Sequence, residues 1–426
     1  MHASSIATVR GRRVWDSRGR PTVEVEVALS GGAVGRAIAP AGASTGTGEA
    51  VDLRDGGLSF GGLDVRRAVA NVNDVIAPAL AGQDALNQEA VDRLLIDLDG
   101  TPNKARLGGN AVVATSMAAL HAAAASRGVP LWRHLAGDGE ATIPLPQIQI
   151  FGGGAHAARR VDVQDFMVAC PTASSFAEAL DRTAEVYRAA GELMAKRGLV
   201  QGVADEGGWW PAFASNEEAL DWLVRAIERA GFAPGDEVAI ALDVAASEFG
   251  AGGCYRLALD GRALDADGMI AMLGGWIERY PIVSVEDPLA EDDPEGFARF
   301  TTAFGQKIQV VGDDFLVTDA RRVREAARAR ACNAVLVKPN QAGTVTEAKA
   351  ALDAAKAAGF ATIVSARSGE TEDTTVVHLA VGWSAGQLKV GSFSRSERMV
   401  KWNEALRIEE TLGPRARLAR PFDSKL

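Results

Sequence analysis

Cysteine and histidine are scarce in this chain of 426 residues. The three cysteines, Cys170, Cys254 and Cys332, are odd in number, widely spaced and without a CxxC pattern. We therefore expect reduced, largely buried thiols of a cytoplasmic protein, and no disulfide framework. Because only five histidines are present, a histidine-rich metal site is not expected either.

Long apolar runs and positive charge are also lacking. No stretch of about 18 apolar residues predicts a membrane span, and the first 20 residues lack the apolar core of a signal peptide. The formal net charge of -10 argues against nucleic acid and against an anionic membrane surface as the main partner. Any phosphate-bearing ligand must therefore be held by local positive charge or by metal.

The length of 426 residues and the apolar content of 47% suit a large two-domain protein. Residues 6–39 alternate apolar and polar side chains around a Gly-Gly turn, which predicts a β-meander. A Gly/Ser/Thr-rich loop, PAGASTGTGEA, follows at 40–50, and helical patterns come next. Small residues and prolines near 134–146 indicate a boundary. We expect an N-terminal α+β domain over 1–138, and a second domain over 139–426.

Charged residues recur at regular intervals through the second half of the chain. Most of them close a short apolar run, as in VAIALD, IVSVED, IQVVGD and AVLVK. The residues are Glu206, Asp243, Glu286, Asp313, Lys338, Arg367 and Lys389. Most intervals fit one strand plus one helix, which predicts successive βα units.

In a (β/α)₈ barrel the carboxyl ends of the strands meet at one mouth, where active sites lie. Carboxylates, two lysines and an arginine gathered there predict a metal-assisted enzyme that acts on an anion. A lone acidic residue at a strand end is more often a helix cap or part of a loop salt bridge. The co-occurrence of so many such residues is what favours a shared site.

Long motifs, in order along nearly the whole chain, resemble those of the enolase family. They are WDSRGRPTVEVEV, GASTG, DEGG, ALDVAASEF, VEDPLAEDD, GDD, VLVKPNQAGTVTEA, RSGETEDT and GQLKVGSFSRSER. The resemblance implies a magnesium-dependent carbon-oxygen lyase built as an N-terminal α+β capping domain on a modified (β/α)₈ barrel. It also implies a homodimer, because Glu24 and Arg407 match positions that form an ion pair between subunits in the family.

The resemblance assigns roles to the acidic residues. Asp243, Glu286 and Asp313 match the three ligands of the first Mg²⁺, an ion that prefers hard carboxylate oxygens. A second Mg²⁺ would bind with the phosphorylated carboxylate substrate, helped by Ser44 in the mobile loop. Glu206 matches the general acid that assists departure of the leaving hydroxyl.

The basic and amide residues receive roles in the same way. Lys338 matches the general base, and we expect Mg²⁺ and the ammonium of Lys389 to lower its pKa. Lys389 matches the group that pairs with the substrate carboxylate. Arg367 and Ser368 match the phosphate-binding pair. His156 and Gln164 match supporting substrate contacts, although His156 could be a packed loop histidine.

Several positions depart from the family pattern, mostly around the leaving group and the mobile loop. Asp165 stands where the family has a glutamate, and we keep it among the catalytic candidates. Ala366 replaces a histidine in SHRSGE. The other departures are Ala41, Gly48, Arg159, Arg160, Trp209 and Trp210. The two tryptophans could line the mouth or merely pack, and the two arginines could contact substrate or lie on the surface.

These departures favour a specialised enzyme that performs the elimination on a modified phosphoglycerate. A relative of enolase with such a role is carboxyphosphonoenolpyruvate synthase, from phosphinate antibiotic biosynthesis, and it is the most specific candidate. The alternative is ordinary phosphopyruvate hydratase, the glycolytic enzyme that converts 2-phosphoglycerate to phosphoenolpyruvate. A second alternative is a non-catalytic, enolase-like binding protein.

Overall fold

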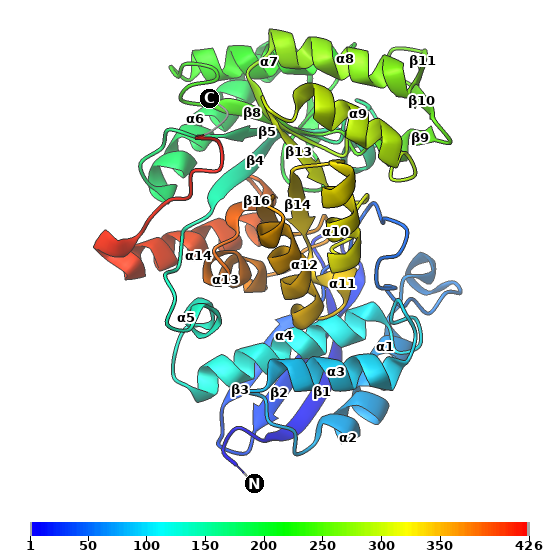
Figure 1. The fold of residues 1–426 in the computed structure, drawn as a ribbon, viewed down its shortest axis with the longest axis vertical. Helices are drawn as coiled ribbons and strands as arrows, with labels where there is room; N and C mark the ends of the chain where they lie inside the picture. Colours follow the sequence, from blue (N-terminus) through cyan, green and yellow to red (C-terminus); the bar gives the residue numbers. More distant parts are fainter. Residues whose placement is uncertain (1, 424–426) are drawn as a thin grey trace.

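Three antiparallel strands open the chain, as the alternating pattern predicts. The computed structural model describes residues 2–423 (Figure 1). The strands lie in the order β1-β2-β3, with bounds Ile6–Trp15, Pro21–Leu29 and Val34–Ile38. A Cβ added at Gly35 would lie 2.1 Å from the backbone nitrogen of Ala122, so glycine lets β3 approach the following helical layer closely.

The helices of the N-terminal part pack on one face of this sheet (Figure 1). Helix α4 is buried almost all round, which explains its Ala-rich sequence with apolar residues on every face. The helical bounds are η1 Ser59–Gly62, α1 Arg66–Asn71, η2 Val72–Ile76, α2 Ala77–Leu80, α3 Gln88–Asp99, α4 Gly109–Ser126 and α5 Leu131–Ala136. The segment η2 is a single π-helical stretch that joins α1 to α2.

Eight strands of the second part close into a barrel, because β16 pairs with β4. The order around the barrel is β4-β5-β8-β12-β13-β14-β15-β16, and β7 and β6 extend the sheet beside β4. The bounds are β4 Leu145–Gly152, β5 Asp165–Ala169, β6 Val200–Val203, β7 Trp209–Pro211, β8 Ala239–Asp243, β12 Ile282–Glu286, β13 Gln309–Gly312, β14 Ala334–Val337, β15 Ala361–Ser365 and β16 Gly386–Ser392. The predicted barrel is confirmed.

One barrel strand runs against the others. Strand β5 is antiparallel to both β4 and β8, whereas the remaining neighbours in the barrel pair in parallel. The inversion is the modification that the resemblance implied. It also places the first residue of β5 at the end of the barrel where the other strands finish.

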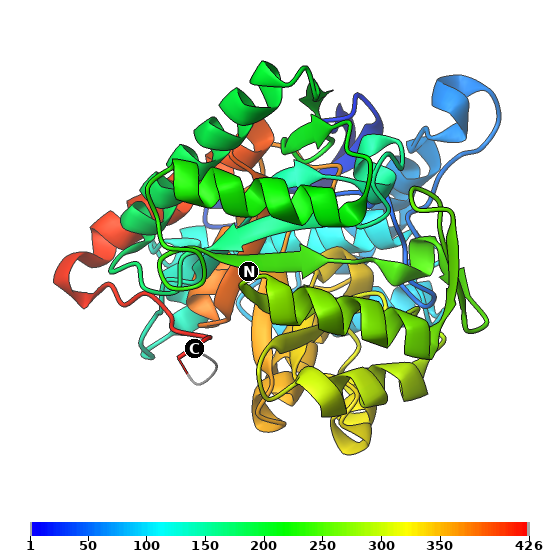
Figure 2. The same cartoon turned by 90° about the horizontal axis from the view of Figure 1, so that it is seen from above.

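Helices surround the barrel, and two views show them outside the strands (Figures 1 and 2). Their bounds are α6 Phe176–Lys196, α7 Asn216–Arg229, α8 Ala266–Arg279, α9 Pro294–Phe304, α10 Ala320–Ala329, α11 Pro339–Ala342, α12 Val345–Ala357, α13 Thr375–Gly382 and α14 Ser396–Leu412. Short helical turns lie at η3 Gly154–Ala157, η4 Ala246–Glu248 and η5 Gly413–Arg415. A small sheet stands at one edge, formed by β9 Gly250–Ala251, β10 Cys254–Leu257 and β11 Arg262–Asp265.

Side-chain caps fix where many of these helices begin. A Ser, Thr, Asp or Asn side chain accepts a backbone N–H of the first turn in each case, which satisfies a donor that the helix cannot. The capping residues are Asn87, Ser175, Ser215, Asp265, Asp293, Asp319 and Thr344. Several of these helices start soon after a strand, so the caps also fix the loops at the barrel mouth.

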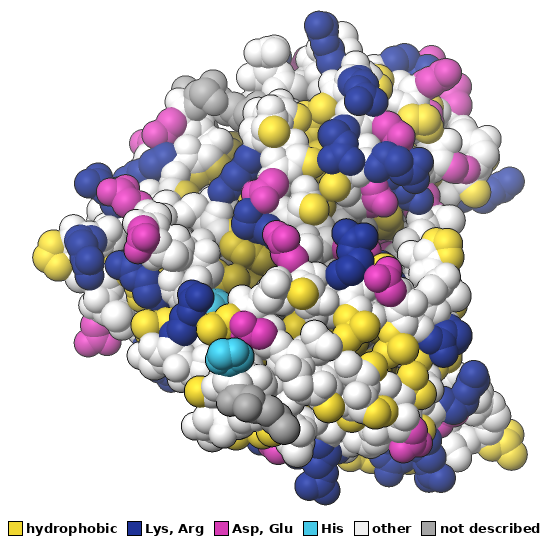
Figure 3. All heavy atoms as spheres, turned by 60° about the horizontal axis from the view of Figure 1, so that its bottom comes forward, with side chains coloured by type: hydrophobic (Ala, Val, Ile, Leu, Met, Phe, Trp, Pro, Cys, Tyr) yellow, Lys and Arg dark blue, Asp and Glu magenta, His cyan; other side chains and the backbone are white. Residues whose placement is uncertain are grey.

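The surface charge, the helix lengths and the cysteine burial bear on what the composition predicts. Basic and acidic side chains are interspersed over the face that Figure 3 shows, without a field of one sign. Within residues 2–423, no helix is long and apolar enough to cross a bilayer; the cytoplasmic location stays a prediction. The cysteines are free, and Cys170 and Cys332 are buried. Cys254, in strand β10 of the small sheet, is exposed.

Candidate active site

The three predicted metal ligands end neighbouring strands. Asp243 is the last residue of β8 and Glu286 the last of β12, and the two are register partners. Asp313 comes directly after β13, the next strand around the barrel. All three carboxylates are buried. The strand order therefore brings them to one mouth, as the spacing in the sequence predicts.

Two lysine ammonium groups neutralise these carboxylates. The Nζ of Lys389 lies 2.7 Å from Oδ2 of Asp243 and 3.0 Å from both carboxylate oxygens of Glu286. Lys338, directly after β14, donates from its Nζ to Oδ2 of Asp313. The single ammonium group of Lys389 therefore contacts Asp243 and Glu286 at the same time.

The surrounding charges shift the pKa of both lysine ammonium groups. Burial disfavours the ammonium of Lys338, but Asp313, Glu286 and Asp314 together outweigh burial and raise its pKa above the ordinary value. The guanidinium of Arg367 opposes this rise. The lowering of the Lys338 pKa by Mg²⁺ and Lys389 stays a prediction. The pKa of Lys389 is raised well above its ordinary value, since Asp243 and Glu286 outweigh burial.

A neighbouring carboxylate holds the loop that carries Asp313. Oδ1 of Asp287 accepts the backbone N–H of Asp313 at 2.9 Å, and Oδ2 accepts that of Asp314 at 2.8 Å. One oxygen from each of these three residues lies within 4.8 Å of the others. In the described part of the chain, Asp243, Glu286 and Asp313 form no group this tight, and each of them contacts a lysine ammonium.

The predicted phosphate-binding arginine is held by the N-terminal loop. Nη1 of Arg367 donates to Oε2 of Glu49 at 2.9 Å, and Nη2 donates to the carbonyl oxygen of Ser44 at 2.8 Å. Ser368 is buried beside it. A Cβ at Gly42 would lie 1.9 Å from Nη2 of Arg367, so glycine at this position lets the loop lie directly on the guanidinium. The structure thus joins residues about 320 positions apart.

A second acidic and imidazole cluster lies across the mouth. Nδ1 of His156 is 3.1 Å from Oδ1 of Asp165, and Nε2 is 3.7 Å from Oε1 of Glu206. Asp165 begins β5, so the inverted strand delivers its carboxylate to the mouth, opposite Asp243 in register. Its Oδ2 lies 3.7 Å from Nζ of Lys389, which links the two clusters.

These contacts shift the titration of each member. Burial disfavours the imidazolium of His156, but Glu206 and Asp165 outweigh it and raise the pKa to about 9. Burial opposes ionisation of Asp165, yet His156 and Lys389 lower its pKa to about 2. Burial raises the pKa of Glu206. A carboxyl group with a raised pKa beside an ionised carboxylate is the pattern of an acid with a separate stabilising anion.

Two buried polar atoms at this mouth have no hydrogen-bond partner among residues 2–423. They are Oε1 of Gln164 and Oδ2 of Asp165. Nε2 of Gln164 donates to Oδ2 of Asp243 at 3.0 Å, so its free oxygen stays beside the acidic cluster. Buried polar atoms are normally paired, and such orphans at a cluster of charges indicate contacts to a bound ligand.

Of the positions that depart from the family pattern, Ala366 lies at the barrel mouth, whereas Arg159, Arg160 and Trp209 make surface or packing contacts. Ala366 lies at the mouth, where its backbone nitrogen donates to the carbonyl oxygen of Lys389 at 2.9 Å. Arg159 and Arg160 are exposed, and Nη2 of Arg159 pairs with Glu248 at 2.7 Å, so these arginines fit the surface alternative. Trp209 stacks on Tyr187 with ring centroids 4.8 Å apart, which shows a packing role for this tryptophan.

Known families match both parts of the chain. Residues 6–135 match a family described as enolase, N-terminal domain, and residues 140–422 match enolase, C-terminal TIM barrel domain. The chain belongs to the enolase family. It is 49% identical to a protein named Enolase 1 from Desulfitobacterium hafniense (strain Y51) over 420 residues, which are 98% of this chain and 96% of that relative. As an enolase family member, it is a carbon-oxygen lyase.

The residues of this enolase-family mouth fit Mg²⁺ by their chemistry. The candidate ligands are buried carboxylates, and a single cation already contacts two of them at 2.7 and 3.0 Å. Carboxylate oxygens are the ligands that Mg²⁺ prefers. The assignment of Asp243, Glu286 and Asp313 as its ligands remains a prediction.

Some residues of the site were not singled out from the sequence. Glu49 pairs with Arg367, Asp287 holds the Asp313 loop, and Gln149 donates to Asp165. Gln341 donates to Oδ1 of Asp313 at 2.9 Å. Asp287 and Gln341 lie within the motifs VEDPLAEDD and VLVKPNQAGTVTEA, but nothing in the sequence shows which motif members touch which partner.

Proposed function

We propose that this chain is a phosphopyruvate hydratase, which converts 2-phosphoglycerate to phosphoenolpyruvate with Mg²⁺. The observation that carries the proposal is one barrel mouth that combines buried carboxylates, Lys338, Lys389 and Arg367. The 49% identity to a protein named Enolase 1 favours this ordinary reaction over the specialised one that the sequence departures suggested. That relative gives no support to a role in antibiotic biosynthesis.

The reaction removes a proton from the carbon next to a carboxylate, which concentrates negative charge on that carboxylate. Mg²⁺, when bound, would stabilise this charge. Lys389 lies beside Asp243 and Glu286 and would pair with the same carboxylate. Lys338 would take the proton. Because Asp313 is a proposed metal ligand, it would share its charge with the metal, and the pKa of Lys338 would fall toward the range a base needs.

The leaving hydroxyl and the phosphate would lie on opposite sides of these groups. Glu206, whose buried carboxyl group has a raised pKa, would donate a proton to the departing hydroxyl. Arg367 and Ser368 would hold the phosphate, and the planar guanidinium suits bidentate contact with its oxygens. Ser44 would join a second, substrate-dependent Mg²⁺. Asp165, His156 and Gln164 would position the substrate between these ends.

The partner proposed for this chain is a second copy of itself. Arg407 lies on α14 with 63% of its side chain exposed and pairs with Glu404, in its own chain, at 2.9 Å. Glu24 is buried in β2, where Arg12 and Arg36 contact it. The exposed guanidinium is available to another subunit, as the family's pattern implies. No nucleic acid or membrane partner is proposed.

Steady-state turnover of 2-phosphoglycerate tests the proposal. The purified chain is incubated with Mg²⁺, and the absorbance of the enol product is followed beside a known enolase. Turnover within about tenfold of that standard, a barrier difference of about 1.4 kcal/mol, supports the proposal. Negligible turnover, with Mg²⁺ binding still measurable by calorimetry, contradicts it.

A second candidate is elimination from a modified phosphoglycerate, and Ala366 at the mouth is the observation that favours it. The loss of an imidazole there removes a donor and leaves room for a bulkier group. The variant Ala366→His separates the candidates. If the chain is an ordinary hydratase, turnover of 2-phosphoglycerate changes by less than about tenfold. A much larger gain would favour the specialised reaction.

A further inference from the structure

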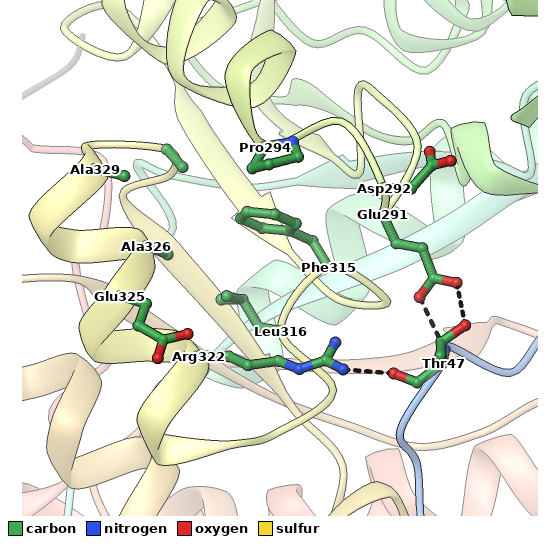
Figure 4. Close-up of a pocket in the computed structure, with 11 residues that line it drawn as sticks. Thr47, Glu291, Asp292, Pro294, Phe315, Leu316, Arg322, Glu325, Ala326 and Ala329 are labelled. Atoms are coloured by element: carbon green, nitrogen blue, oxygen red, sulfur yellow. Dashed lines mark hydrogen bonds between the residues drawn. The ribbon is translucent and has the colours of Figure 1, made fainter. Parts of the chain in front are cut away.

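The loop that carries Ser44 is fastened at its tip. We call residues 40–50 the lid segment. The backbone nitrogen of Thr47 donates to Oε2 of Glu291 at 2.8 Å, and its Oγ1 donates to Oε1 of the same carboxylate at 2.7 Å. Nη2 of Arg322 donates to the carbonyl oxygen of Thr47 at 2.7 Å. Figure 4 shows all three contacts at the rim of a pocket of about 450 Å³.

This arrangement depends on the residue that follows Thr47. Gly48 has φ +103°, a backbone conformation that side chains rarely adopt, and a Cβ there would lie 2.7 Å from Nη2 of Arg322. Gly48 stands where the enolase family pattern has a histidine. The glycine therefore gives Arg322 the room it needs to reach the carbonyl oxygen of Thr47.

The carboxylate of this fastening belongs to a loop that leads from the metal site. Glu291 follows Glu286, the last residue of β12, by five positions. The backbone nitrogen of Glu291 donates to Oγ of Ser247 at 2.9 Å, and Oδ2 of Asp292 accepts from the backbone nitrogen of Gly252 at 3.1 Å. The same loop thus contacts the lid segment and the segment that follows Asp243.

The base of the lid segment is fixed separately. The carbonyl oxygen of Ser44 and the carboxylate of Glu49 both contact Arg367. A Cβ at Gly46 would lie 2.6 Å from Cγ1 of Val317, so the segment also packs tightly on the loop after β13. Thr47 is exposed, and burial does not hold it in place. The tip depends on its polar contacts.

We propose that Glu291 and Arg322 are positioning residues of this enzyme, which latch the lid segment through Thr47 and thereby place Ser44. The inference rests on the proposed function, because Ser44 matters there as a ligand of the substrate-dependent Mg²⁺. Neither residue touches the reacting atoms. Their effect on the reaction passes through the position of the lid segment.

Hydrogen exchange of the substrate-free protein tests the latch directly. Glu291→Gln replaces one of the two oxygens that accept hydrogen bonds from Thr47 by an NH₂ group, and Arg322→Ala removes the donor to the carbonyl oxygen of Thr47. We expect the backbone amides of residues 44–48 to exchange about three- to tenfold faster in both, since a hydrogen bond contributes modestly to local stability. Glu325→Gln, a change to an exposed residue on α10 at the same pocket, is the matched control and should leave this exchange unchanged.

A pair of substitutions at Thr47 separates the latch from general structural damage. Thr47→Val removes the hydroxyl group but keeps the shape, and Thr47→Ser keeps the hydroxyl group. We expect faster exchange of the lid segment in the valine variant and nearly normal exchange in the serine variant. Exchange at the wild-type rate in the valine variant, Glu291→Gln and Arg322→Ala together would overturn the proposal.

Kinetics then show whether the latch matters to the reaction. With 2-phosphoglycerate, we expect Glu291→Gln and Arg322→Ala to raise KM and the half-activating Mg²⁺ concentration by about three- to tenfold. Binding of the first Mg²⁺ without substrate, measured by calorimetry, should not change. Faster exchange with unchanged KM and Mg²⁺ requirement would overturn the positioning role. If the wild-type chain has no turnover at all, the proposed function fails, while the exchange data still decide whether the latch exists.

Discussion

The pKa of His156 reports the charges that surround it at the barrel mouth. Its pKa of about 9 lies above the ordinary 6.5, so the protonated imidazole stabilises the native state. That contribution is complete below about pH 6.5 and is lost as the pH rises through about 9. Asp165 has the opposite sign: its pKa of about 2 lies below the ordinary 3.8, so its contribution is complete above about pH 4 and is lost as the pH falls through about 2.

NMR titration of the histidines tests this arrangement. Five histidines give a spectrum simple enough to assign with a His156→Gln variant. We expect a midpoint near 9 for His156, lowered by at least about one pH unit in Asp165→Asn because a partner carboxylate is removed. Asp236→Asn, an exposed change, is the control and should leave the midpoint unchanged. A wild-type midpoint near 6.5 would refute the ion pair.

The convergence of the candidate residues on one barrel mouth was predictable from the sequence, but their individual contacts were not. Asp243, Glu286 and Asp313 were found because strand ends converge in a barrel, a property of local pattern. The sequence did not indicate that Asp313 raises and Arg367 lowers the pKa of Lys338, because only packing decides which charges lie nearest to its ammonium group. Glu49 was missed for the same reason, since its partner Arg367 is 318 positions away.

At the scale of elements, α6 and β7 fit together through one glycine. A Cβ at Gly191 in α6 would lie 2.5 Å from Cζ2 of Trp209 in β7. Gly191→Ala should therefore lower the free energy of unfolding by about 1–3 kcal/mol, since the indole cannot move without disturbing its stack on Tyr187. Chemical denaturation measures the change.

A second helical glycine supplies the control for this substitution. Gly275 in α8 has nothing within 4 Å of an added Cβ, so Gly275→Ala should stabilise the protein by about 0.5–1 kcal/mol. Equal effects of the two alanines would show that the contact with Trp209 does not restrict α6. The opposite signs we expect follow from packing alone, because both glycines lie inside helices.

The rhythm of strands and helices was predictable, but the direction of one strand was not. Short apolar runs closed by charged residues predicted the barrel, and the closed sheet confirms it. From β5 alone, DFMVA, the antiparallel direction has no local signal, because a strand buried on both faces looks the same either way. The tertiary arrangement decides this direction, and it is what carries Asp165 to the mouth.

At the scale of the whole molecule, the account predicts a homodimer. Arg407→Glu would place a negative charge at the position proposed to meet the acidic Glu24 of a second copy. We expect sedimentation to show a dissociation constant raised by at least about tenfold, as repulsion replaces attraction. Arg324→Glu, an exposed change on α10, should not alter the dissociation constant. An unchanged dimer in Arg407→Glu would remove this pair from the interface.

The central claim is that the barrel mouth removes the proton next to a carboxylate, with Lys338 as the base. Exchange of that proton in 2-phosphoglycerate, followed by NMR in D₂O with Mg²⁺, tests it most directly. We expect rapid exchange in the wild type, a loss of at least about 100-fold in Lys338→Ala, and Mg²⁺ binding retained in that variant. Exchange near the wild-type rate in Lys338→Ala would contradict the account.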